Sequence, residues 1–179
     1  LFQIVGHQGY ICSLQCHIRA GCTHCDIRGR PGHGRRVVDG MADDSAGGDT
    51  NGNGASNGSP TSWRGVVFNA TSTNCALNYA DIRYGGAGFI SNVHCNSASP
   101  TLSHCVIRNN YTHGINLNSN SSPTVTNCTF TSNGGNAIDG VQFAALPGLV
   151  NNTASQNSGN YARVTSASVS TNLTIAATA

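Results

Sequence analysis

The chain has 179 residues, of which 9% are charged, and its formal net charge at pH 7 is +2. All nine basic residues are Arg and all seven acidic residues are Asp, so Lys and Glu, two good helix formers, are missing while Asn, Ser, Thr and Gly are frequent. The small net charge gives no support for nucleic-acid binding, and no window approaches the roughly 18 apolar residues of a membrane span.

Residues 1–42 form an atypical segment that is rich in Cys, His and Arg and lacks a hydrophobic period. A metal or haem site is one interpretation, although the two Cys pairs lie closer together than the pairs of structural zinc sites usually do. A disulfide-stapled cap of an exported solenoid is the second. A non-native sequence, such as a shifted reading frame, is the third, and the missing hydrophobic period favours it. The candidate metal ligands are Cys12, Cys16, His17, Cys22, His24 and Cys25.

Residues 43–62 form a loop rich in Gly, Asn and Asp, and this composition predicts a calcium site. Asp49, Asn51 and Asn53 place oxygen ligands at alternate positions before the turn residue Gly54, as in the first half of a calcium loop. Pro60 stands where a bidentate Glu would complete an EF-hand, so a complete EF-hand is excluded. The alternative is a flexible turn without a metal. The candidate calcium ligands are Asp43, Asp44, Asp49, Asn51 and Asn53.

Within residues 63–179 the chain repeats itself every 23–25 residues. Each copy contains an apolar residue, a small residue, a second apolar residue, an Asn or Gly, and a final Ile, in a fixed order. Alternation around the second apolar position predicts a β-strand, the Asn and Gly positions favour a turn, and a second short strand should begin near the last position. The copies are Leu77, Ala80, Ile82, Gly85, Ile90; Leu102, Cys105, Ile107, Asn110, Ile115; Val125, Cys128, Phe130, Asn133, Ile138; and a decayed fourth copy, Leu149, Asn152, Ala154, Asn157, Ala162.

These repeats predict an all-β fold, a parallel β-helix or solenoid of about four to five turns. Side chains at equivalent positions should stack into buried columns, with successive turns about 4.8 Å apart, so Leu102 should lie on Val125 and Ile107 on Phe130. An antiparallel β-sandwich would also give short strands, but it would not force the same order of positions in consecutive copies. Free buried thiols are expected rather than a disulfide at Cys105 and Cys128.

The units "SPTLSHCVIRNN" and "SPTVTNCTFTSNGGNAI" resemble the repeats of right-handed, pectate-lyase-like parallel β-helix proteins. The segments "DDSAGGDTNGNG" and "NYADIRYGG" resemble the lead-in of β-helix domains in bacterial secreted or cell-surface proteins, and "VSTNLTIAATA" resembles their closing strand. The resemblance covers residues 43–175 and implies a right-handed β-helix located outside the cell or on its surface. It implies no activity, because the repeat only describes how turns stack.

The expected function is a non-catalytic structural or binding module that contacts a polysaccharide or a cell-surface glycan, or mediates adhesion. Arg83 and Arg108 follow the inward Ile of two successive copies and should form a small outward cationic ladder. Tyr and Arg side chains can stack on sugars or hydrogen-bond to them. Further turns of a longer parent chain, or self-association through open ends, are the other expected partners. The candidate contact residues are Arg83, Tyr84, Arg108, Tyr111 and His113.

The alternative function is a fragment of a calcium-dependent polysaccharide lyase or of a glycoside hydrolase. A lyase of this type needs calcium-binding carboxylates and a basic residue on one face, and a hydrolase needs neighbouring acids. Asp81 and Asp139 are the only acidic residues of the repeats, and they occupy different positions two turns apart. No catalytic residue is therefore assigned.

Overall fold

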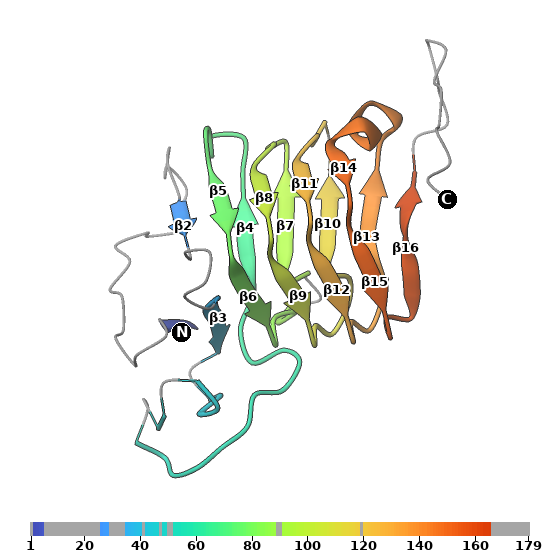
Figure 1. Cartoon of the computed structure of the whole chain (residues 1–179). Coiled ribbons are helices and arrows are strands. Elements are labelled where there is room, and N and C mark those ends of the chain that lie inside the picture. Colours follow the sequence, from blue (N-terminus) through green and yellow to red (C-terminus); the bar gives the residue numbers. More distant parts are fainter. Residues whose placement is uncertain are drawn as a thin grey trace.

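The structure, a computed structural model, describes residues 2–5, 26–28, 35–40, 42–46, 48–49, 52–88, 91–118 and 120–165. Short strands dominate it and form three sheets, which stack turn upon turn along one axis (Figure 1). Sheet A contains β1 (Phe2–Val5), β3 (Arg36–Gly40), β6 (Ala80–Arg83), β9 (Val106–Arg108), β12 (Thr129–Thr131) and β15 (Thr153–Ser155). Sheet B contains β2 (Asp26–Arg28), β5 (Ala76–Asn78), β8 (Thr101–Ser103), β11 (Thr124–Thr126) and β14 (Leu149–Val150). Sheet C contains β4 (Val66–Phe68), β7 (Val93–Asn96), β10 (Ile115–Asn118), β13 (Asn136–Val141) and β16 (Gly159–Val164).

Each complete turn visits sheet B, then sheet A, then sheet C, as in β5, β6 and β7. Equivalent strands of successive turns pair in parallel, so the chain is a parallel β-solenoid of about four turns, as the repeats predicted. The sequence predicted two strands in each turn, whereas the structure has three. The first apolar position of each copy lies in a separate strand. This strand is only three residues long, because a corner follows it directly.

The core consists of columns of inward side chains, which confirms the central prediction. Leu102 pairs with Val125 in sheet B, and Ile107 pairs with Phe130 in sheet A. All four are at most 1% exposed. Burial of one such side chain stabilises the fold by about 1.5–3 kcal/mol, and each turn supplies several of them.

One of the predicted columns, the one in sheet C, is wrong in one member. The partner of Ile115 in the preceding turn is Val93, which is fully buried, and not the predicted Ile90, which lies outside the described residues. The connection after β6 is therefore longer than its counterpart after β9. The buried amide of Asn92 occupies this connection, where it donates to the carbonyl oxygens of Ile82 and Arg108 and accepts from the Gly85 backbone N–H.

The corners between the sheets contain residues with left-handed backbone conformation, and these also form columns. The column between sheets B and A has φ values of 53–54°, and the column after sheet A has values of 53–60°. The sequence predicted left-handed conformations within the stretches 84–86, 109–110 and 132–136, and the structure has one at the first residue of each: Tyr84, Asn109 and Ser132. The columns are Tyr79, His104, Asn127 and Asn151, and Tyr84, Asn109, Ser132 and Gln156.

The solenoid also begins earlier than the predicted residue 63. Strand β2 pairs in parallel with β5, and β3 pairs in parallel with β6, so parts of the atypical segment 1–42 belong to an additional turn. Sequence analysis missed this turn because longer connections separate its three strands: residues 29–35 between β2 and β3, and 41–65 between β3 and β4. The proposed metal, haem or disulfide residues between Cys12 and Cys25 lie outside the described residues.

The four described cysteines are free thiols, as predicted for Cys105 and Cys128. Both side chains are buried at neighbouring turns, where the Cys105 backbone N–H donates to Cys128 Sγ at 3.4 Å. The Cys105 thiol itself donates to the Leu77 carbonyl oxygen at 3.2 Å. These thiols therefore serve as small core residues with satisfied hydrogen bonds.

Candidate binding surface on the outer face of sheet A

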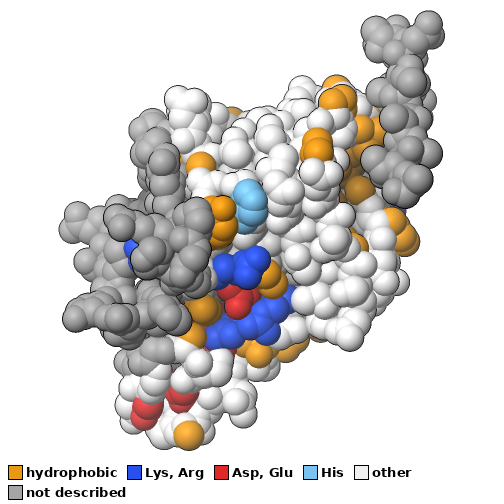
Figure 2. Space-filling view, in the orientation of Figure 1, with side chains coloured by type: hydrophobic (Ala, Val, Ile, Leu, Met, Phe, Trp, Pro, Cys, Tyr) orange, Lys and Arg blue, Asp and Glu red, His pale blue; other side chains and the backbone are white. Residues whose placement is uncertain are grey.

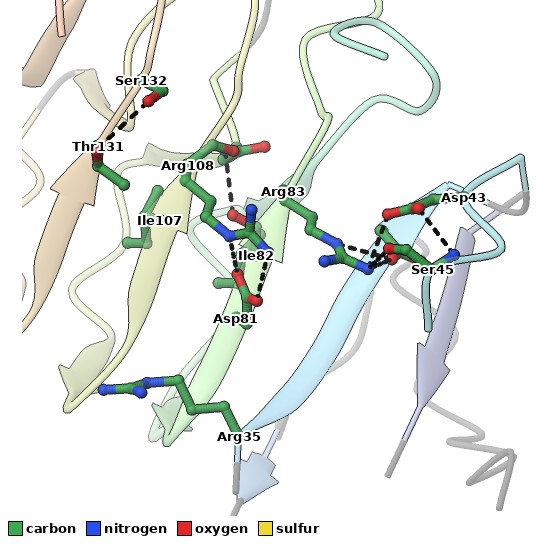
Figure 3. A network of polar contacts seen from close by, with 12 residues as sticks. Arg35, Asp43, Ser45, Asp81, Ile82, Arg83, Ile107, Arg108, Thr131 and Ser132 are labelled. Carbon is green, nitrogen blue, oxygen red and sulfur yellow. Dashed lines mark hydrogen bonds and ion pairs between the residues drawn. The ribbon is translucent and has the colours of Figure 1, made fainter. Parts of the chain in front are cut away.

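Two arginines lie side by side on the outer face of sheet A, because Arg83 of β6 is the register partner of Arg108 of β9. Each follows an inward Ile, so the alternation of the strand directs its side chain outward. Figure 3 shows both guanidinium groups with their carboxylate partners, and Figure 2 shows arginine side chains gathered around a carboxylate on this face. We call the two residues the arginine row.

Arg83 is not the exposed ligand-contacting residue that the sequence predicted. Only 7% of the residue is exposed, because the connection after β3 covers its side chain. Its Nε donates to Asp39 Oδ2 at 3.1 Å, and its Nη2 lies 2.8 Å from Asp43 Oδ2 and 2.9 Å from Ser45 Oγ. A buried arginine needs such partners, so the contacts of Arg83 anchor residues 39–45 to the solenoid.

The ionisation of Asp43 follows from these contacts. Burial of the carboxyl raises its pKa, whereas the hydrogen bond from Ser45 and the charge of Arg83 lower it, and the net effect is a pKa below the ordinary value. Asp43 is therefore an anion that forms an ion pair with Arg83. Binding a calcium ion, the role predicted for Asp43, would compete with this ion pair.

Arg108 remains accessible while it is held in place. Its Nε donates to Asp81 Oδ1 at 2.9 Å and its Nη2 to Asp81 Oδ2 at 3.0 Å, and 27% of its side chain is exposed. The hydrogen bonds that Arg108 donates to Asp81 raise the pKa of Arg108 further above its ordinary value, so the charge is permanent. Arg35, an exposed residue, donates its Nε to the carbonyl oxygen of His104 on the same side of the solenoid.

The three other predicted contact residues lie at the corners that follow sheet A. Tyr84 is half-buried; its ring lies 5.6 Å from the Arg83 Cζ and fills the space beside Gly58, so it serves mainly as a packing residue. Tyr111 is 49% exposed. His113 accepts a hydrogen bond from the Asn136 backbone N–H at Nδ1, with a distance of 2.8 Å. Arg83, Tyr84 and Arg108 are thus neighbours, while Tyr111 and His113 occupy the corner beyond β9.

Sequence analysis missed a second arginine–aspartate pair, formed by Asp139 of β13 and Arg163 of β16 on sheet C. The Arg163 guanidinium binds both oxygens of the Asp139 carboxylate through Nε and Nη2, with 2.8 Å for the Nη2 contact. The two residues follow the equivalent inward positions Ile138 and Ala162, which could have indicated the pair. Ala162 belongs to the decayed copy, in which the repeat pattern is too weak to indicate the role of its neighbour.

The predicted calcium ligands Asp43, Asp44 and Asp49 already have partners within the protein. Both Asp49 oxygens accept hydrogen bonds from the backbone N–H groups of their own loop, at Asn53 (3.1 Å) and Gly54 (2.9 Å). Asp44 Oδ2 accepts from the backbone and hydroxyl of Ser56, and Asn51 lies outside the described residues. No group of three or more His, Cys or Asp side chains suited to a metal occurs among the residues that the structure describes. Calcium binding stays a prediction, and a calcium titration followed by calorimetry tests it.

Comparison with known proteins adds no assignment. No protein-family model matches the chain, and no curated protein or solved structure is significantly similar to it. Within the described ranges, no helix has the length and apolar character required to cross a membrane. Any functional argument therefore depends on the geometry of the solenoid surface.

Proposed function

We propose that the chain is a non-catalytic binding module of an exported bacterial surface protein and contacts a polysaccharide through the outer face of sheet A. The contact residues are Arg108 and Tyr111, with His113 beside them. Arg83 and Tyr84 lie beside this surface, one turn earlier, and pack within the protein rather than touching the ligand. The proposal keeps the predicted surface but divides the five residues between two roles.

The proposal depends on one observation, namely that both aspartates of the repeats are paired with an arginine. Asp81 is bound bidentately by Arg108, and Asp139 by Arg163. A lyase would need such carboxylates for calcium, and a hydrolase would need one of them protonated near the other. An aspartate that already forms two charge-assisted hydrogen bonds with arginine is a poor candidate for either task. This arrangement disfavours the alternative of an enzyme within the described turns.

Arg108 suits ligand binding because Asp81 occupies only one edge of its guanidinium. The edge formed by Nη1 and Nη2 still has donors for a sugar hydroxyl or carboxylate. Holding the side chain in one orientation also reduces the conformational entropy that binding would cost. Tyr111 adds an exposed aromatic ring three residues further along the chain, and aromatic rings of this kind pack against the apolar faces of sugars.

A glycan array followed by titration of the best ligand tests this proposal. We expect Tyr111→Ala and Arg108→Gln to weaken binding by about tenfold, the loss typical of one charge-assisted hydrogen bond or one aromatic contact. The matched controls are Val150→Ala and Arg64→Gln, which change exposed residues elsewhere. Equal losses in all four variants would contradict the assigned surface.

An activity assay tests the alternative. Incubation with polygalacturonate or alginate in the presence of calcium, followed by the ultraviolet absorbance of unsaturated products, should give no turnover. Sustained product formation that is abolished by Arg108→Gln would replace the binding module with a lyase. The extracellular location is tested separately, by fractionation of cells that express the protein.

A further inference from the structure

Arg163 lies at the centre of a polar cluster on the outer face of sheet C. The cluster, which we call the Arg163 cluster, contains Arg163 and Tyr161 of β16, Asp139 and Asn136 of β13, and His113 from the preceding corner. Asp139 is almost fully buried, whereas 54% of the Arg163 side chain and 57% of Tyr161 are exposed. A buried acceptor thus holds an exposed cation at the surface.

Every oxygen of Asp139 has a donor. Besides the two contacts with Arg163, Oδ1 accepts from Asn136 Nδ2 at 2.7 Å, and Oδ2 accepts from Asn116 Nδ2 at 3.4 Å. Asp139 is therefore saturated and fixed. Its function in the cluster is to orient the guanidinium, because the Nε and Nη2 contacts determine both the position and the plane of that group.

The opposite edge of the guanidinium is available for a ligand. Within the described residues no acceptor contacts Arg163 Nη1, so Nη1 and the second Nη2 proton form a fork of the geometry that a carboxylate fills. The same unit occurs on sheet A in Asp81 and Arg108, but there the arginine side chain is only 27% exposed. Arg163 is the more accessible of the two.

The neighbours of Arg163 add a second donor and an aromatic surface. His113 Nδ1 accepts the Asn136 backbone N–H, so the proton of the neutral ring is on Nε2, which lies 3.8 Å from Asp139 Oδ2. The ring of Tyr161 folds over Gly159, where a Cβ would lie 2.8 Å from Tyr161 Cζ and 2.3 Å from Asn136 Oδ1. Gly159 thus makes room for the aromatic ring next to Asn136, which itself binds Asp139.

From this geometry we infer that the Arg163 cluster is a second, separate binding site and that it takes the carboxylate of a hexuronic acid. The carboxylate binds the free edge of Arg163, and the sugar ring lies against Tyr161. A neutral hexose lacks the charged partner, and a small inorganic anion lacks the ring that contacts Tyr161. The inference extends the proposed polysaccharide binding on sheet A and shares only His113 with that surface.

The test is calorimetric titration of the whole chain with tetragalacturonate and, in parallel, with a galactose oligomer of equal length. We expect Arg163→Gln to weaken tetragalacturonate binding by about tenfold or more, and Arg163→Lys to recover little of the loss, because lysine cannot form the bidentate fork. Arg64→Gln, which removes another exposed arginine, should leave the affinity within twofold. Titration with inorganic phosphate separates uronate recognition from general anion binding.

Two variants that retain Arg163 test whether a loss of binding in Arg163→Gln could come from a folding defect alone. Tyr161→Ala removes the ring, and Gly159→Ala displaces it, so each should weaken tetragalacturonate binding by about threefold to tenfold without abolishing it. Unchanged affinity in Arg163→Gln overturns the inference, as does phosphate binding as tight as tetragalacturonate binding. Loss of binding only in Arg108→Gln and Tyr111→Ala would also overturn it while leaving the proposed function intact. Loss only in the Arg163 cluster variants would remove the proposed sheet A surface and support this one.

Discussion

Asn133 and Asn157 are joined across two neighbouring turns by a single oxygen. Asn157 Oδ1 accepts hydrogen bonds from both the backbone N–H (3.0 Å) and the side-chain Nδ2 (2.8 Å) of Asn133. Asn133 repeats part of this pattern one turn earlier, where its Oδ1 accepts from the Asn110 backbone N–H at 3.2 Å. These buried amides therefore satisfy the backbone of the corner after sheet A, which water cannot reach.

Replacing Asn133 should show how much this ladder contributes. In Asn133→Ala the Asn110 N–H loses its acceptor and the Ile107 carbonyl oxygen loses a donor. We expect the free energy of unfolding to fall by at least about 2 kcal/mol, because each buried polar group left unpaired costs about 1–3 kcal/mol. Urea denaturation measures it. The control is Asn118→Ala, at an exposed position, which should stay within about 0.5 kcal/mol of the parent.

Gly140 and Gly88 provide a matched pair for testing how closely the turns approach. Both have left-handed backbones, with φ of 79° and 76°. A Cβ at Gly140 would lie 2.1 Å from the Leu117 carbonyl oxygen, whereas a Cβ at Gly88 meets nothing within 4 Å. Gly88→Ala should cost about 1–2 kcal/mol of backbone strain, and Gly140→Ala should cost clearly more. Equal thermal midpoints for the two variants would contradict the close approach.

The described thiols should be chemically silent in the native state. Burial raises the pKa of the Cys95 thiol to about 12, so at pH 8 it is neither ionised nor accessible. In a variant with Ser at Cys12, Cys16, Cys22 and Cys25, we expect a thiol reagent to label the remaining cysteines only at the rate of unfolding. Rapid labelling of the folded protein at a stoichiometry of one or more would contradict this.

Asp139 should make the fold sensitive to acid. Hydrogen bonds from Arg163 outweigh the effect of burial and hold the pKa of Asp139 below its ordinary value of 3.8. Because the unfolded chain binds the proton more readily, this contribution to stability is present above about pH 4 and is lost as the pH falls through the lowered pKa. Thermal unfolding between pH 6 and pH 2 should reveal the loss, and Arg163→Gln should shift it to higher pH. An unshifted profile in Arg163→Gln would exclude the pair as its source.

The end of the solenoid should favour self-association or the addition of further turns. Among the described strands, none pairs with the outer edges of β14, β15 and β16. A hollow lies there, lined by apolar residues such as Phe130 and Ile138 and by polar residues such as Asn152, and unpaired strand edges readily accept another chain. We expect sedimentation velocity to show larger species as the concentration rises, and Val150→Lys to suppress them. Tyr111→Lys, on a different surface, is the control, and a monomer at every concentration would refute the prediction.

The sequence predicted the interior of the molecule far better than its exterior. Leu102, Val125, Ile107 and Phe130 could be assigned because inward positions must be apolar in every turn, so the repeat itself reports on burial. The corresponding outward positions obey no such constraint. Whether Arg83 is exposed depends on a connection that follows a different strand, and composition alone does not predict where that connection lies.

The same reason explains why the Arg163 cluster was missed. Its contacts join residues about one turn apart, namely His113 with Asn136 and Asp139 with Arg163. Such pairs become visible only when the register of β13 and β16 is known. Ile90 and Val93 show the complementary error. The spacing of the repeat predicts Ile90 for this column, but the longer connection places Val93, three residues onward, beside Ile115.

The register of the turns also has a consequence for how such a rod changes length. Thr101 and Thr124 are equivalent neighbours in sheet B, so excising residues 102–124 would connect Thr101 directly to Val125 and leave each remaining strand beside a homologous one. Duplication of the same stretch would extend the rod equally smoothly. The excision would, however, remove Arg108, so that Asp81 would lie opposite Thr129 and Arg83 opposite Thr131. Genetic gain or loss of one unit therefore preserves the scaffold but changes the charged residues on its outer face.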